Sequence, residues 1–115
     1  CPTGKIIAIK GHKLGLVHAV LAMPDELADD EQVVVNYCDF ICYSDWQHFK
    51  QFVDESECDG AIPACKGFHP YSLDTTNYAY MKEQDGWVQD IQEKQHYTDN
   101  VLEEHASSGT YYFKS

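Results

Sequence analysis

Three polar features of this chain carry side chains that could do chemistry. They are Asp39, the adjacent pair Glu93 and Lys94, and the small residues Ser107-Ser108-Gly109. Asp39 could hold a divalent cation, Lys94 could bind a phosphate, and Glu93 could accept hydrogen bonds from hydroxyl groups. A turn of small residues with exposed amides would add donors for an anion. Together these residue types suit a phosphate or sugar ligand.

Each feature also has a plainer interpretation. Asp39 could be a loop carboxylate that caps the next turn, because a single Asp after a strand is common. Glu93 and Lys94 are neighbours, and neighbouring side chains on a strand point to opposite faces, so they could be a surface pair. The residues alone leave both interpretations open.

The five cysteines offer less chemistry than their number suggests. Cys38 and Cys42 have a spacing that could begin a zinc site with a histidine, but a second closely spaced ligand pair is missing. We expect the cysteines to be free thiols that behave as small buried hydrophobes.

The charge of the chain limits its partners. Asp and Glu number 19 against 8 Lys and Arg, which gives a net charge of -11. This charge repels a nucleic-acid backbone, so we expect no nucleic-acid partner. An anionic substrate needs a local Lys or a divalent cation to reverse the sign of the field, so phosphate chemistry here needs a metal.

The length and the apolar pattern indicate one domain with no membrane segment. A chain of 115 residues suits a single core, spanning residues 1–115. No apolar run approaches the ~18 to 20 residues that cross a bilayer, and Cys1-Pro2-Thr3-Gly4 lacks a signal pattern. We expect a cytoplasmic protein, and a start without Met suggests a fragment or a processed chain.

The stretch from Val33 to Phe40 would position Asp39. Three consecutive β-branched residues, Val33 to Val35, precede Asn36-Tyr37-Cys38 and then the carboxylate. This pattern predicts a strand that is buried on both faces and delivers Asp39 at its C-terminal end. In an open α/β sheet, ligands bind at that end of the strands.

Two helices are expected around this strand. Apolar residues recur at helical spacing after Gly15 until Pro24 ends the pattern. Ser44 and Gln47 have the spacing of a capping box, which predicts a helix that starts at Ser44 and ends near Glu57. We expect its aromatic face to cover the sheet.

The remaining strands are predicted from local patterns. Asp85-Gly86 lies between two apolar segments and predicts a hairpin. Pro63 indicates an edge or a bulge in the segment around it. The polar span 95–105 is long enough to be a flap or a short helix. The predicted strands are 5–9, 33–40, 59–65, the two hairpin arms 78–82 and 87–91, and 110–113. The sum is an α/β fold, a mixed sheet with covering helices.

Five stretches occur in a fixed order along the chain: Gly15-Leu16-Val17-His18-Ala19-Val20, Val33 to Phe40, Tyr78-Ala79-Tyr80 with Asp85-Gly86-Trp87-Val88, Glu93-Lys94, and Ser107-Ser108-Gly109-Thr110-Tyr111. In this order they resemble the motifs of the sugar nucleotidyltransferases, the group that contains glucose-1-phosphate thymidylyltransferases. The resemblance runs through most of the chain. It implies a Rossmann-like core with a mixed, mostly parallel sheet.

The resemblance also implies a reaction and its residues. In this family a sugar 1-phosphate attacks the α-phosphorus of a nucleoside triphosphate and pyrophosphate leaves. By resemblance, Asp39 binds Mg²⁺, and Asp39 and Lys94 are the catalytic residues. The residues implied to contact substrate are Gly15, Leu16, Ala79, Glu93, Lys94, Ser107, Ser108 and Gly109.

The chain departs from the family pattern in ways that bear on assembly and specificity. The Gly-rich loop with which the family pattern begins does not occur here, so we interpret the chain as a partial catalytic domain. A sheet without its first strand would expose an edge, and we therefore expect a homo-oligomer through that edge. Ala79 stands where the family often has Gly, and Gln95 stands where it has Pro.

Two other functions remain compatible with the residues. The chain could be a non-catalytic module that binds a sugar phosphate or nucleotide through Glu93 and Lys94. It could also be a structural or interaction domain in which those residues have no ligand. Turnover and ligand binding distinguish the three hypotheses.

Overall fold

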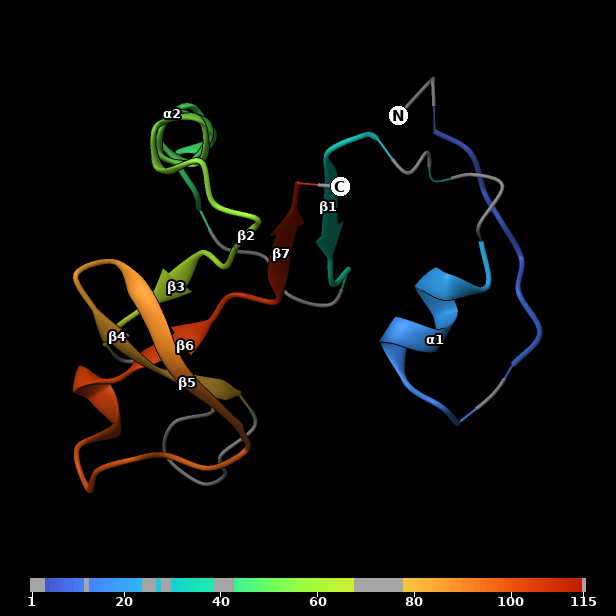
Figure 1. Cartoon of the computed structure of the whole chain (residues 1–115). Helices are drawn as coiled ribbons and strands as arrows, with labels where there is room; N and C mark the ends of the chain where they lie inside the picture. Colours follow the sequence, from blue (N-terminus) through green and yellow to red (C-terminus); the bar gives the residue numbers. More distant parts are fainter. Residues whose placement is uncertain are drawn as a thin grey trace.

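The computed structural model describes residues 4–11, 13–23, 27, 30–38, 43–67 and 78–114. Over these residues the chain forms two small β-sheets, one long helix, one short helix and a single 3₁₀ turn (Figure 1). The elements in chain order are α1 Leu16–Leu21, β1 Val33–Asn36, α2 Trp46–Ser56, β2 Gly60–Ala61, β3 Ala64–Cys65, β4 Ala79–Gln84, β5 Trp87–Glu93, η3 Val101–Glu103, β6 His105–Ser107 and β7 Thr110–Phe113.

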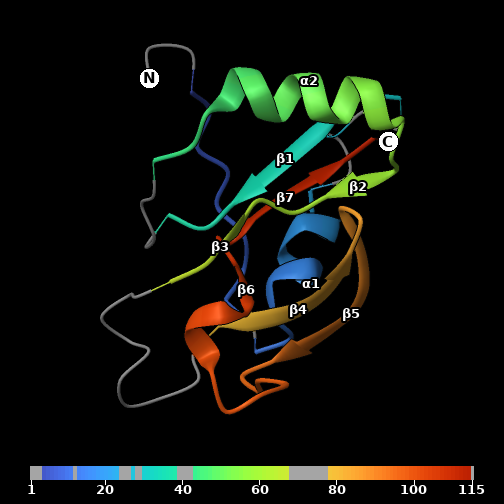
Figure 2. The ribbon, with the colours of Figure 1, turned by 90° about the vertical axis from the view of Figure 1, so that its left-hand side faces the viewer.

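The first sheet has the strand order β1-β7-β2. Val33 pairs with Phe113, Asn36 pairs with Thr110, and Gly60 also pairs with Phe113. Both pairings are antiparallel, so β1 and β2 run in the same direction with β7 between them. Figure 2 shows α2 along one face of this sheet and α1 on the opposite side.

The second sheet has the order β3-β6-β4-β5 and contains the predicted hairpin. Asp85 and Gly86 have φ angles of 54° and 83°, the left-handed values that a two-residue hairpin turn needs. The pairing shifts register between Lys82 and Glu83, whose partners are Asp90 and Val88, so Gln89 is the extra residue of a bulge in β5. The hairpin predicted from Asp85-Gly86 is confirmed, with its arms extended to 79–84 and 87–93.

The expectation of a mostly parallel sheet is not confirmed. Every strand pairing among the described residues is antiparallel. The physical reason lies in β7, which inserts between the two strands that α2 connects and pairs with the backbone of both. The mixture of helix and sheet is that of an α/β fold, with fewer helices than a doubly wound sheet has.

The segment 59–65 differs from the single strand that was expected. It contributes β2 to the first sheet and β3 to the second, and the break falls at Ile62-Pro63. Proline cannot donate to a ladder, so pairing stops there and the chain changes sheet. The chain changes sheet in the same way between β6 and β7, at Ser108-Gly109.

One cluster of core residues lies where α2 packs on the first sheet. Val53, Cys58 and Tyr112 are buried there, and Phe49 and Ala61 pack against them. The Phe49 ring meets the Tyr112 ring edge-on, with centroids 6.4 Å apart. The helix therefore covers the sheet as expected.

The start of α2 differs by one residue from the prediction. Its cap is Asp45, whose carboxylate accepts the His48 amide at 3.0 Å, and not Ser44. The first helical residue is accordingly Trp46.

The strand predicted over 5–9 is wrong. Residues 4–11 are exposed and form no sheet pairing with the described strands, and the Ile6 side chain is 98 % exposed. A short apolar run becomes a strand only when a neighbouring strand pairs with its backbone and covers its side chains. The helix expected after Gly15 is present as α1. Of the helices in the described residues, none has the length and apolar character to span a bilayer.

Candidate functional site

A hollow of about 760 Å³ lies between α1 and the first sheet. In β1, Val33 and Val35 face the hollow while Val34 points to the other side, because successive side chains of a strand alternate. The same alternation in β7 presents Tyr111 and Phe113 to the hollow. The full lining is Gly15, Leu16, Val17, Val20, Leu21, Leu27, Glu31, Val33, Val35, Tyr37, Glu93, Tyr111 and Phe113.

Three of the residues implied to contact substrate meet in this hollow. Gly15 and Leu16 come from the start of α1, and Glu93 comes from the end of β5. Gly15 has a φ of 88°, a conformation that L side chains rarely adopt, so this position suits glycine although the space beside it is open. The fold thus joins residues from distant parts of the chain around one cavity.

Ala79 is placed beside Glu93 by the strand register. The two residues are direct partners in the β4–β5 ladder. The next backbone contact is made by the Lys94 amide, which donates to the Tyr78 carbonyl at 2.8 Å. The small Ala79 side chain therefore lies beside Glu93. The hydrogen bond from the Lys94 amide to the Tyr78 carbonyl fixes the backbone at the end of the hairpin.

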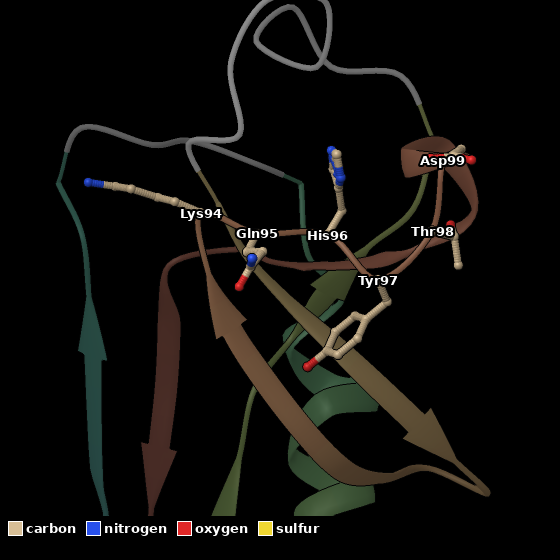
Figure 3. A pocket seen from close by; sticks show the side chains of 6 residues that line it. All are labelled: Lys94, Gln95, His96, Tyr97, Thr98 and Asp99. Atoms are coloured by element: carbon tan, nitrogen blue, oxygen red, sulfur yellow. The ribbon is translucent and has the colours of Figure 1, made fainter.

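Lys94 faces a different cavity. A pocket of about 470 Å³ is lined by the segment Lys94–Asp99, which Figure 3 shows from close by. In that view the Lys94 side chain extends away from those of His96 and Asp99. Lys94 Nζ lies 3.9 Å from Glu93 Oε1, with 64 % and 80 % of the two side chains exposed. A pair this exposed contributes little to stability, and both groups remain accessible to a ligand.

Ser107, Ser108 and Gly109 are not the exposed turn that was expected. All three are buried, since they lie where the chain crosses between the two sheets. The Ser108 amide donates to the Pro63 carbonyl at 3.0 Å, and the Gly109 amide donates to Ser107 Oγ at 3.2 Å. These two amides are therefore engaged inside the protein, while the buried Ser108 hydroxyl has no hydrogen-bond partner among the described residues.

Gly109 nevertheless shapes the hollow through Tyr37. Its φ is +73°, and a Cβ built on it would lie 2.7 Å from Cδ2 of the Tyr37 ring. The Gly109 carbonyl accepts the Tyr37 amide at 3.0 Å, and the Tyr37 ring meets the Tyr111 ring edge-on with centroids 6.0 Å apart. The absence of a side chain at 109 lets an aromatic residue of the lining pack against the crossover.

The proposed metal ligand Asp39 lies outside the described residues, as does Cys42. Among the residues that are described, no three His, Cys, Asp or Glu side chains lie close enough to hold a metal ion. Cys38 and Cys58 are free thiols, as expected, but only Cys58 is buried and Cys38 is exposed. Cys65 is half-buried, and its Sγ donates to the Ala106 carbonyl at 3.6 Å.

Glu104 is a functional candidate that the sequence did not reveal. Its carboxylate is buried and accepts the Thr98 amide at 2.6 Å, the Thr98 hydroxyl at 2.8 Å, and the Tyr97 amide at 3.1 Å and 3.0 Å from its two oxygens. Burial raises the pKa of Glu104, but these hydrogen bonds outweigh it and leave the pKa below its usual range. In the sequence it is one acidic residue of a polar span, and only the tertiary structure separates it from its neighbour Glu103.

Tyr97 is fixed on the second sheet by its side chain. Its hydroxyl donates to Asp90 at 2.9 Å, and Lys82 Nζ lies 4.8 Å from the centre of its ring. Desolvation of the hydroxyl, followed by the hydrogen bond to Asp90, raises the pKa of Tyr97 to about 12. The phenol therefore stays protonated and remains a donor to Asp90 throughout the physiological range.

The comparisons with known proteins identify a family. The family model for nucleotidyl transferase matches residues 4–115, which is nearly the whole chain. Comparison with curated proteins and with solved structures gave no match.

Proposed function

This chain belongs to the nucleotidyl transferase family, and on that premise we propose that it transfers a nucleotidyl group from a nucleoside triphosphate to a sugar 1-phosphate. The observation that carries the proposal is the convergence of Gly15, Leu16 and Glu93 on one hollow, with Lys94 adjacent to Glu93. We propose the cytoplasm, where nucleoside triphosphates are abundant, as its location.

The lining of the hollow suits a nucleobase. A flat, largely apolar ring system packs well against aliphatic and aromatic side chains such as Val35 and Tyr111. The volume of about 760 Å³ falls in the range of small-molecule sites, ~300 to 1,000 Å³. Because Gly15 has no side chain and no atom lies within 4 Å of where its Cβ would be, the backbone at the start of α1 is open to a base edge.

Glu93 and Lys94 would bind the sugar 1-phosphate. The Glu93 carboxylate accepts hydrogen bonds from sugar hydroxyls, and Lys94 supplies a positive charge for the phosphate in a chain of net charge -11. The phosphate oxygen then forms a bond to the α-phosphorus of the triphosphate while the bond to pyrophosphate breaks. Such a step depends mainly on positioning and charge neutralisation.

Mg²⁺ is the proposed metal, held by Asp39. A carboxylate oxygen is the ligand type that Mg²⁺ prefers, and the ion would neutralise phosphate charge that the acidic protein otherwise repels. The residues of this chain do the remaining work: Glu93 orients the sugar, Lys94 binds its phosphate, and the apolar hollow excludes water from the base.

The test is pyrophosphate release from a nucleoside triphosphate and a panel of sugar 1-phosphates in the presence of Mg²⁺. Asp39→Asn should lower kcat/KM by ~100-fold or more. Lys94→Ala should raise KM for the sugar 1-phosphate. The matched controls are Asp54→Asn and Lys50→Ala, which remove the same groups from exposed positions on α2 and should leave turnover unchanged.

A binding module without catalysis is the second candidate, and it is supported by Glu93, which lines the hollow beside its ladder partner Ala79. It predicts heat of binding for a sugar 1-phosphate that depends on Lys94, with no pyrophosphate released. If the chain is a structural domain, neither heat of binding nor pyrophosphate release is expected. Calorimetry and the turnover assay on the same preparation therefore separate all three functions.

A further inference from the structure

We propose that Glu104 is a positioning residue for substrate phosphate: its buried carboxylate holds the segment Lys94–Asp99 in the conformation that presents Lys94. The inference rests on the proposed function, because it takes Lys94 as the group that binds the sugar phosphate. Glu104 itself does not touch the substrate and acts only through the segment.

We call the Glu104 carboxylate, with the hydrogen bonds it accepts from Tyr97 and Thr98, the Glu104 clamp. Its side chain is 9 % exposed, and the donors it receives come from Tyr97 and Thr98 in the middle of the segment. Hydrogen bonds from amides to a carboxylate are about twice as strong as neutral ones. A buried carboxylate that is satisfied by one segment binds that segment tightly, because releasing it would leave the charge without partners.

The segment needs such a clamp because it begins in an unfavourable conformation. Lys94 has a φ of 56°, which costs free energy for a residue with a side chain. Its amide is tied to the Tyr78 carbonyl at one end, and Glu104 ties the backbone again at Tyr97 and Thr98. Figure 3 shows the six side chains spreading from this short loop, with Lys94 at one end and Asp99 at the other.

The side chain of Tyr97 attaches the segment at a second point. The Tyr97 side chain lies on the hairpin, held by Asp90 and Lys82, while its amide is held by Glu104. The backbone between Lys94 and Tyr97 is therefore fixed at both ends and cannot shift without breaking one of these contacts. The position of Lys94 and the direction of its Cα–Cβ bond follow from that constraint.

The experiment compares Glu104→Gln with Glu103→Gln in the whole chain. A glutamine at position 104 would keep one acceptor oxygen for the Thr98 donors, but it would present an NH₂ group to the Tyr97 amide in place of the second oxygen and lose the charge that strengthens these hydrogen bonds. Position 103 is exposed, and the same charge is lost there. Glu104→Gln should raise KM for the sugar 1-phosphate ~10-fold or more with a smaller change in kcat, since misplacement of a binding group can cost ~100-fold. Glu104→Asp, which keeps the charge, should fall between wild type and Glu104→Gln.

Amide hydrogen exchange gives a readout that does not depend on turnover. Exchange at Tyr97 and Thr98 should become at least ~10-fold faster in Glu104→Gln and stay unchanged in Glu103→Gln, because only the first variant opens the clamp. If Glu104→Gln fails to fold, Thr98→Val removes one donor of the clamp and should show the same KM effect at smaller size.

Different results would overturn the proposed transferase function and the positioning role of Glu104. A wild-type chain that releases no pyrophosphate overturns the proposed function and leaves the clamp to be judged by exchange. An active enzyme whose KM for the sugar 1-phosphate is the same in Glu104→Gln and wild type overturns the positioning role. Unchanged exchange at Tyr97 and Thr98 in Glu104→Gln overturns the clamp itself.

Discussion

Gly109 is the residue on which the shape of the hollow depends most directly. Its φ is positive, and a Cβ at this position would lie 2.7 Å from the Tyr37 ring, so the space admits hydrogen alone. Tyr37 in turn lines the hollow next to Tyr111. The structure gives Gly109 a packing role beneath the lining, and the substrate contact that the resemblance implies for it stays a prediction.

We predict that Gly109→Ala destabilises the chain by about 1–3 kcal/mol, because alanine must adopt a strained φ and displace an aromatic ring. Gly11→Ala is the matched control, since a Cβ at Gly11 meets no atom within 4 Å. Chemical denaturation measures both. Equal stability of the two variants would contradict the packing role.

The ionisation of Glu104 makes a second residue-scale prediction. Its pKa is lower in the folded chain than in the unfolded chain, so its contribution to stability is complete above the unfolded value, ~4.3, and is lost as the pH falls through the lower folded value. Glu104→Gln should therefore flatten the acid limb of stability against pH. Denaturant midpoints measured across this range, with Glu103→Gln as the control, test it; parallel curves for wild type and Glu104→Gln would contradict it.

At the scale of elements, α2 shows how a local pattern can predict a helix and misplace its first residue. Ser44 and Gln47 have the capping-box spacing, but the Asp45 carboxylate accepts the His48 amide and the helix begins at Trp46. Ser and Asp are both good caps, so the sequence could not separate them. The approach of α2 to the sheet, with its apolar face against Tyr112, selects the register.

We predict that Asp45→Ala destabilises the chain by ~1 kcal/mol, because the first turn of α2 loses an acceptor for its amide. Asp45→Asn should cost much less, since asparagine caps equally well. Thermal unfolding of the two variants measures the difference. A loss of the same size in both would mean that the negative charge, and not the hydrogen bond, matters at position 45.

At the scale of the whole molecule, the open edge of β1 is the feature with the largest consequence. In the first sheet β1 pairs only with β7 among the described residues, and Val34 is 53 % exposed. An edge strand of β-branched residues is a template for any matching strand. We propose that the chain forms a homo-oligomer by pairing β1 with a second copy.

Sedimentation should show a dimer that dissociates on dilution, and Val34→Lys should shift it to monomer, because an edge lysine resists strand addition. Phe52→Lys places the same charge on an exposed apolar site of α2 and should leave association unchanged. A monomer at every concentration in the wild-type chain would rule out edge pairing.

The features that depend on local interactions could be predicted from the sequence. Consecutive β-branched residues specified the strand at Val33, apolar spacing specified the two helices, and Asp85-Gly86 specified the hairpin, because each depends on residues within a few positions of one another. The expectation that the strand at Val33 is buried on both faces was wrong, since it lies at the end of its sheet and Val34 is exposed. The motif order pointed to the sugar nucleotidyltransferases, and the comparison with family models confirms the broader nucleotidyl transferase family.

Only the tertiary structure decided which strands pair and which polar groups are enclosed. The placement of β7 between β1 and β2, the burial of Ser107 to Gly109, and the enclosure of Glu104 depend on residues far apart in the chain. Backbone groups and buried charges take whichever partners the packing supplies, and no local pattern specifies those partners. For that reason Glu93 could be predicted as a candidate ligand-binding residue from its residue type. The hydrogen bonds by which Glu104 holds the segment Lys94–Asp99 became visible only in the folded chain.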